Sequence, residues 1–279
     1  MNRMYDCDTM VSNVAAIDID KDVERAFKKA LTLIDIDDLN TKERPVAVKV
    51  GVFNHKKGHH YTTVDCANAI VKGFDKASTV YVVESDNYKG KGSERLQIYK
   101  DVFSNHVVPF NLSEDSETKE VQITDEKIGF SHILFKPTVM VSTHVLREAE
   151  IGSILKNLLG LIPDRKKARF HTKLVPALLD TYEAIGGIDL AVLDGTFMYS
   201  ESTDVEYGVK TNVLIVGRDA VAVEAVGLKL VGLNPESIPI IQEAVKRGLG
   251  EGNLEKINIL GSSLDTLTEK IQQQLKNRQ

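Results

Sequence analysis

The chain has 279 residues, of which 42% are hydrophobic and 27% charged, a composition typical of a soluble globular protein with a substantial core. Its apolar runs are far shorter than the roughly 20 residues of a membrane-spanning helix, and residues 1–13 lack the apolar segment of a secretory signal. The formal net charge of −5 disfavours a broad nucleic-acid-binding surface, and two cysteines without a signal indicate a reducing compartment. We therefore expect a cytoplasmic protein that does not bind membranes, with nucleic acid an improbable partner.

The first half of the chain alternates apolar runs with amphipathic segments. Residues 21–34 carry apolar side chains at helical spacing between two segments in which Ile and Asp alternate. Pro45 precedes an apolar run, and Thr62 and Thr63 stand where a helix N-cap is expected. The expected elements are a helix at 21–34, a strand at 46–52, a helix at 66–74, a strand at 80–84 and a helix at 93–103.

The second half begins with a polar segment at 111–127, in which Val121 to Thr124 alternate as in an exposed or edge strand. Apolar runs resume near Ile133, and Gly186-Gly187 is a typical helix stop. The elements expected beyond residue 172 are a helix at 174–185, strands at 190–193 and 212–216, helices at 219–230 and 238–247, a strand at 257–260 and a closing helix at 263–279.

Repetition of strand, loop and helix is the pattern of parallel βα units, in which ligands gather at the carboxyl ends of the strands. We therefore predict an α/β fold with an open, mainly parallel or mixed sheet flanked by helices, as one domain or two lobes. We interpret residues 1–279 as a single α/β domain, with an N-terminal helical extension at 1–44, a core at 45–262 and a C-terminal helix at 263–279.

Positive charge is concentrated where apolar segments meet polar loops, chiefly between residues 130 and 171. In a parallel sheet such residues can converge around a carboxylate or phosphate group through charge-assisted hydrogen bonds. The alternative is that they are solvated charges at the starts of loops. The residues that we expect to converge are Lys49, Lys136, His144, Lys156 and Arg169.

His144 and Lys156 are the candidate catalytic residues. Lys156 lies in an apolar stretch, where desolvation lowers a lysine pKa and favours a base or nucleophile; it could equally bind an anion or extend to solvent. His144 could transfer protons, bind a metal or be a hydrogen-bonded structural group. The candidate substrate-binding residues are Lys49, Thr62, Thr63, Lys136, Asn157, Arg169, His171 and Asp194.

A second histidine-rich segment lies at residues 55–60. His55, His59 and His60 could bind a metal, or the segment could be a basic lid beside Thr62 and Thr63, which would donate to an anion from a helix N-terminus. The sequence leaves the metal unknown. Asp219 opens a predicted helix, where a carboxylate typically caps.

These landmarks resemble the domain-of-unknown-function family 362. That family has a strand-end Lys, a Thr-His pair, a small-residue loop, Leu-Lys-Asn, Leu-Gly and a basic stretch ending in Arg and His. The matching residues here are Lys136, Thr143-His144, Leu155-Lys156-Asn157, Leu159-Gly160 and Arg169 to His171, with Lys49 before Thr62-Thr63, Asp194-Gly195 and Gly217-x-Asp219 as further landmarks. The resemblance spans about residues 45 to 262.

The chain departs from the family in two places. Val50-Gly51 follows Lys49 where the family usually has Pro-Asn, and the cysteine-rich ferredoxin-like module often present in the family is missing from this sequence. Cys7 and Cys66 cannot supply the four thiolates of an iron–sulfur cluster. We therefore expect no iron–sulfur cluster on this chain, and redox chemistry would need a separate redox protein.

The resemblance implies no established activity, so the function is inferred from the residues. We predict an enzyme that acts on a small anionic metabolite, a carboxylate or phosphate compound, in a cleft lined by Lys and His. The alternative is a non-catalytic carrier or accessory protein that binds a metabolite, a metal or a redox partner. The sequence leaves the cofactor, the reaction type and the formation of homo-oligomers open.

Overall fold

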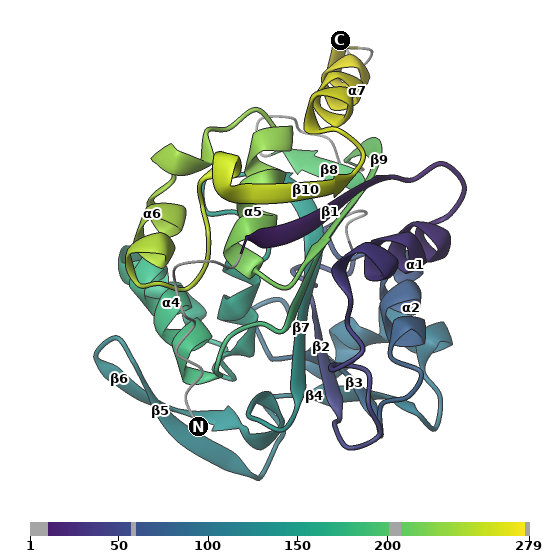
Figure 1. Ribbon diagram of the computed structural model, residues 1–279. Coiled ribbons are helices and arrows are strands. Elements are labelled where there is room, and N and C mark those ends of the chain that lie inside the picture. The colour runs from purple at the N-terminus through teal and green to yellow at the C-terminus, as the bar shows by residue number, and fades with distance from the viewer. Residues whose placement is uncertain (1–10, 57–59, 201–207, 277–279) are drawn as a thin grey trace.

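An eight-stranded sheet forms the centre of the protein in a computed structural model that describes residues 11–56, 60–200 and 208–276 (Figure 1). Five of its seven neighbouring pairs are parallel, and β9 runs antiparallel to both of its neighbours. This confirms the predicted α/β class with a mainly parallel sheet. The strand order is β10 (Ile257–Gly261), β1 (Ser12–Asp18), β9 (Val209–Gly217), β8 (Leu190–Ser200), β7 (Val139–Glu148), β2 (Val46–Val50), β3 (Val80–Glu84) and β4 (Val107–Asn111).

Helices cover both faces of the sheet. One face packs against α1 (Val23–Ile34), α2 (Val64–Gly73) and the 3₁₀ helix η1 (Leu96–Val102). The other face packs against α4 (Leu174–Ala184), α5 (Ala220–Leu230) and α6 (Pro239–Lys246), together with α7 (Leu264–Lys276) (Figure 1). The shorter elements are α3 (Gly92–Arg95), the hairpin β5 (Thr118–Ile123) with β6 (Glu126–Ser131), η2 (His132–Leu134), η3 (Lys156–Leu161), η4 (Lys167–Lys173), η5 (Pro235–Ser237) and η6 (Leu254–Lys256).

The alternation of side chains along each strand divides the core into two clusters. In β2, Val46 and Val48 pack toward α1 and α2, whereas Ala47 packs toward the face that α4 and α5 cover. Every residue of β2 is buried, as expected for a central strand of a parallel sheet. Lys49 is the one charged residue in this strand, and its burial therefore requires specific partners.

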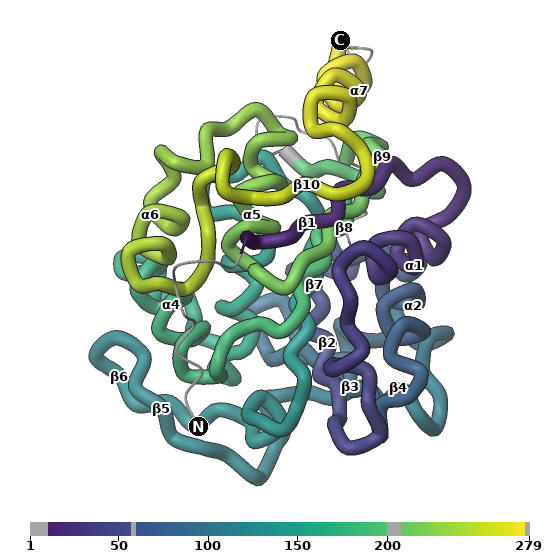
Figure 2. The backbone as a smooth tube through the Cα atoms, viewed as in Figure 1, coloured from purple at the N-terminus to yellow at the C-terminus, as the bar shows by residue number. Residues whose placement is uncertain are grey.

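The N-terminal segment differs from the predicted helical extension. Ser12–Asp18 forms β1, which lies between β10 and β9, so residues from both ends of the chain are neighbours in the sheet (Figure 2). The segment has only four consecutive buried residues, Val14 to Ile17, which is too short a signal to separate a strand from a loop by period alone. The predicted helix at 93–103 also divides into α3 and η1.

Asp219 provides the cap that was predicted for α5 and also joins that helix to two other segments. Its carboxylate accepts from Val221 N at 2.9 Å, from Glu251 N at 2.8 Å and from Ser12 Oγ at 2.6 Å. Replacing Asp219 by alanine should lower the free energy of unfolding by about 2 kcal/mol, because a cap and two further hydrogen bonds are lost. Urea denaturation would measure this.

The matched control is Asp22→Ala, which removes the exposed cap of α1 and its bond from Arg25 N at 2.7 Å. That change should cost less, because Asp22 joins no second segment. Equal losses for the two variants would contradict a role for Asp219 in holding β1 and residue 251 against α5.

Candidate functional site

A buried lysine lies at the carboxyl end of β2. Lys49 is 1% exposed, and its Nζ donates to Val50 O at 2.7 Å, Asn157 Oδ1 at 2.9 Å and Glu84 Oε2 at 3.1 Å. Three acceptors match the three N–H donors of an ammonium group. Burial lowers the pKa of Lys49, and Glu84 opposes this effect. The complete set of acceptors supports the charged form.

Glu84 ends the neighbouring strand β3 and is the carboxylate at the centre of a cluster that also contains Lys49, Arg95 and Lys167. Its Oε1 accepts from Ser85 N at 2.9 Å, and its Oε2 lies 3.4 Å from Nη1 of Arg95. Burial alone would raise the pKa of Glu84, but the positive charges of Lys49, Arg95 and Lys167 outweigh it and hold the pKa below its ordinary value of 4.5. Glu84 is therefore ionised at neutral pH.

Arg95 joins the ends of two strands. Its guanidinium donates to Val52 O, which follows β2, and to Ser85 O, which follows β3. The side chain is 1% exposed, and α3 places it beneath both loops. Arg95 thus holds together the backbone turns that follow Lys49 and Glu84.

Lys167 is the third cation of the cluster. Its Nζ donates to Ser85 Oγ at 2.5 Å, and Ser85 Oγ in turn donates to Gly160 O at 2.6 Å. Burial lowers the pKa of Lys167 to about 7, with Glu84 opposing and Lys49 and Arg95 adding to the decrease. Lys167 is 8% exposed, so it is the cation of the cluster nearest to solvent.

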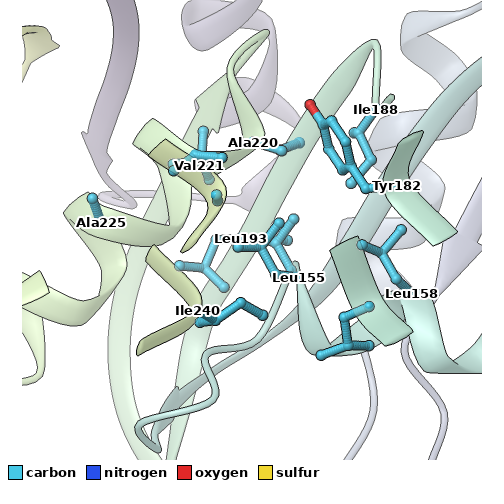
Figure 3. Packing of buried hydrophobic residues seen from close by; sticks show 14 of the residues in the cluster. Leu155, Leu158, Tyr182, Ile188, Leu193, Ala220, Val221, Ala225 and Ile240 are labelled. Atoms are coloured by element: carbon cyan, nitrogen blue, oxygen red, sulfur yellow. The ribbon is translucent and has the colours of Figure 1, made fainter. Parts of the chain in front are cut away.

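The short helix η3 closes the cluster from the face that α4 and α5 cover. Leu155 and Leu158 anchor it in the apolar core, which also contains Leu193 of β8 (Figure 3). Asn157, between these two leucines, donates through Nδ2 to Lys49 O at 3.0 Å and to Thr143 O at 3.0 Å. Asn157 therefore fixes Lys49 and ties the end of β2 to β7.

Gly160 allows the closest approach to the cluster. A Cβ atom at this residue would lie 2.6 Å from Lys49 Nζ and 3.1 Å from Glu84 Oε1. No side chain fits without displacing the two charged groups. Gly160 is therefore required, because its backbone packs directly against Lys49 and Glu84.

His144 of β7 lies on the same face of the sheet as Lys49. Its ring packs on Gly51, where a Cβ atom would lie only 2.7 Å from Nε2, and its Nδ1 is buried without a hydrogen-bond partner among the described residues. Burial lowers the pKa of His144 well below its ordinary value of 6.5, and the charges of Arg147, Lys49 and Lys156 lower it further. The imidazole is neutral at pH 7, and these charges lie around it.

Four residues singled out in the sequence, Lys49, His144, Lys156 and Asn157, therefore lie together at the carboxyl end of β2, beside the middle of β7. Lys156 is half-buried at the start of η3, and its charge acts on His144. Gly51, part of the Val50-Gly51 pair that stands where the family usually has Pro-Asn, leaves room for the imidazole ring of His144.

Thr62, Thr63 and Asp194 form a separate group toward α2. Thr63 caps α2 and donates to Asp194 Oδ2 through its backbone N at 2.8 Å and its Oγ1 at 2.7 Å. Thr62 Oγ1 donates to Thr143 O at 3.1 Å. Thr62 and Asp194 are both 0% exposed, so this group joins α2 to β7 and β8 rather than facing solvent.

Lys136, Arg169 and His171 do not join the cluster. Lys136 precedes β7 and pairs with Asp189 at 2.6 Å, which precedes β8, so both lie at the amino ends of these strands. Arg169 pairs with Glu126 at 2.8 Å and with Asp164 at 2.7 Å. His171 is exposed on η4.

Glu84, Ser85, Arg95 and Lys167 were not predicted as site residues from the sequence. A charged residue directly after the apolar run 80–83 was the available signal for Glu84. Nothing in the local pattern around Arg95 or Lys167 indicates burial.

The histidine-rich segment is described only in part, because Lys57, Gly58 and His59 lie outside the described residues. Within residues 11–56, 60–200 and 208–276, no three His, Cys, Asp or Glu side chains are arranged to hold a metal ion. Among these residues, no helix is both long and apolar enough to span a membrane.

Residues 46–229, about two thirds of the chain, match the family described as Domain of unknown function (DUF362). The chain therefore belongs to this family, and the resemblance drawn from its motifs is confirmed. The half of the sheet that holds the cluster consists of β7, β2, β3 and β4. The matched region contains these four strands together with η3 and η4. No curated protein matches the sequence.

Proposed function

We propose that this protein is an enzyme that acts on a small anionic metabolite, a carboxylate or phosphate compound, at the carboxyl ends of β2 and β3, beside the middle of β7. The observation that supports this most directly is the gathering of three buried cations, Lys49, Arg95 and Lys167, around the single carboxylate of Glu84. Three cations exceed what one carboxylate neutralises, and a bound anion would balance the excess.

The position of the cluster also favours this function. Ligands of open α/β sheets bind beyond the carboxyl ends of parallel strands, and Lys49 and Glu84 both stand at such ends. The two surface depressions at β10 and the start of α7 lie on the far edge of the sheet and present few charged groups. They lack the convergent cations that would recognise an anion.

His144 and Lys156 supply the catalytic chemistry in this proposal. A neutral imidazole at pH 7 is able to accept a proton, and His144 lies within the field of three cations that would stabilise a developing negative charge on a substrate. Lys156 lies at the start of η3, next to Asn157, and adds positive charge there.

The test is a thermal-shift screen of phosphate monoesters, dicarboxylates, monocarboxylates and neutral analogues, followed by mass spectrometry of each stabilising compound after incubation. We expect anionic compounds to raise the melting temperature and neutral analogues of the same shape to leave it unchanged. Lys136→Ala is the control, because Lys136 lies at the opposite ends of the strands. Stabilisation by neutral compounds alone would contradict the anion site.

The same screen separates an enzyme from a carrier. An enzyme should convert at least one stabilising compound, and Lys156→Ala should then lower turnover by more than it lowers affinity. A carrier should bind its anion without converting it. Binding without conversion across the screen would favour the carrier.

A further inference from the structure

The cluster of Lys49, Arg95, Lys167 and Glu84 has an excess of positive charge. Lys49, Arg95 and Lys167 carry three positive charges when protonated, and Glu84 carries one negative charge, which leaves an excess of two. Asp86 also faces Lys167, but it does not change this balance, because its negative charge is matched by Arg165 at 3.8 Å. His144 is neutral and contributes no charge.

We propose that the anion bound here is a dianion of the phosphate-monoester class, and that Lys167 is the side chain that selects a dianion over a monocarboxylate. This inference rests on the proposed function, because it assigns the charge of the ligand of that same site. A dianion neutralises the excess of two, whereas a monocarboxylate leaves one buried positive charge unbalanced.

Lys167 has the position that such a role needs. Of the three cations Lys49, Arg95 and Lys167 it is the most accessible to solvent, and among the described residues its Nζ donates to the neutral hydroxyl of Ser85. Lys49 Nζ, by contrast, already has three acceptors, and Arg95 donates to two carbonyl groups. A ligand oxygen could therefore bind Lys167 without displacing an ionic partner.

Lys167 also couples binding to protonation. The groups that face it are Glu84, Lys49, Arg95 and Asp86, and with burial they bring its pKa to about 7. Below pH 7 the side chain is already charged, so a dianion binds without proton uptake. Above pH 7 a proton must be taken up on binding, and affinity falls by up to tenfold per pH unit until the raised pKa of the complex is reached.

Sulfate is the appropriate probe, because it remains a dianion from pH 6 to pH 9, and acetate is the matching monoanion. Calorimetric titrations of the intact protein at constant ionic strength should show sulfate binding at least tenfold tighter than acetate at pH 6. Lys167→Met should remove most of that preference, because the variant carries an excess of only one charge. Lys167→Arg should keep the preference and abolish the pH dependence between 7 and 9, since arginine stays protonated.

Proton uptake by the unmodified protein provides a test that needs no variant. Sulfate titrations at pH 8 in two buffers of different ionisation enthalpy should give different binding heats. The difference should be close to the full difference between the two ionisation enthalpies, which corresponds to uptake of close to one proton. Equal affinity for sulfate and acetate, or a sulfate affinity that does not change from pH 6 to pH 9, would overturn the assignment of a dianion while leaving the anion site intact. Failure of both anions to bind at pH 6 would overturn the proposed function as well.

Discussion

Replacing Glu84 by glutamine should lower the free energy of unfolding by about 3–5 kcal/mol, because three cations would then lie in the interior without a carboxylate. Glutamine has nearly the same shape, so the change reports charge rather than volume. Its carbonyl oxygen could still accept one hydrogen bond from Lys49 or Val52 N, but no negative charge would remain. Urea denaturation at pH 7 would measure the loss.

The control is Glu114→Gln, which removes an exposed carboxylate 3.8 Å from Lys91 and should change stability little. The pH dependence of the unmodified protein gives a second check. The pKa of Glu84 is held below 4.5 in the folded state, so its contribution is present above pH 4.5 and disappears as the pH falls through the folded value. A Glu84→Gln protein as stable as the original at pH 7 would contradict an ionised Glu84.

Sulfate should reduce the loss of folding stability that Glu84→Gln causes. With the carboxylate replaced, the cluster has an excess of three positive charges, and a bound dianion would neutralise most of it. Stabilisation by sulfate should therefore be larger for Glu84→Gln than for the original protein. A smaller stabilisation would indicate that Glu84 is needed to shape the anion site rather than only to balance its charge.

The part of the site that could be predicted from the sequence is the part that strand geometry fixes. Lys49 and His144 each follow an apolar run, and the parallel register of β2 and β7 brings the end of β2 beside His144, in the middle of β7. Asn157 was identified through its family motif, and its four hydrogen bonds to Lys49, Ser142 and Thr143 explain why an amide is needed there.

Lys136 lies apart from the cluster because the strand follows this residue, whereas the prediction required the strand to precede it. The apolar run at 133–135 suggested a strand that ends at Lys136, but His132–Leu134 is a 3₁₀ turn and β7 begins after Lys136. This places the lysine at the amino end of β7, against Asp189. A short apolar run does not distinguish a strand from a turn that packs on the core.

The period of two along a strand explains why Thr62, Thr63 and Asp194 lie apart from the cations. Adjacent residues of β7 point to opposite faces: Val141 packs with α2 and Met140 with η3, so Thr143 points to the α2 side and His144 to the η3 side. Arg95 and Lys167 reach the cluster only because α3 and η4 fold back over the loops after β3. No local pattern carries that information.

Replacing His144 by glutamine should lower the turnover of the substrate found in the screen by about 10²–10⁴-fold and leave its affinity within a few fold, if the imidazole transfers a proton. Glutamine keeps a polar side chain of similar length but cannot accept and return a proton. The control is His132→Gln, because His132 is half-exposed in η2 and pairs with Asp115, outside the cluster.

The pH profile of turnover distinguishes proton transfer from a structural role of His144. Burial and the nearby cations hold the pKa of this imidazole well below 6.5, so it stays neutral as the pH falls through 6.5 and becomes protonated only at a lower pH. Turnover that requires the neutral base should therefore persist at pH 6 and decline in the acid limb below it. A bound anion adds negative charge and raises the pKa, so this limb should lie at higher pH for kcat than for kcat/KM. An acid limb that remains in His144→Gln would assign it to another group.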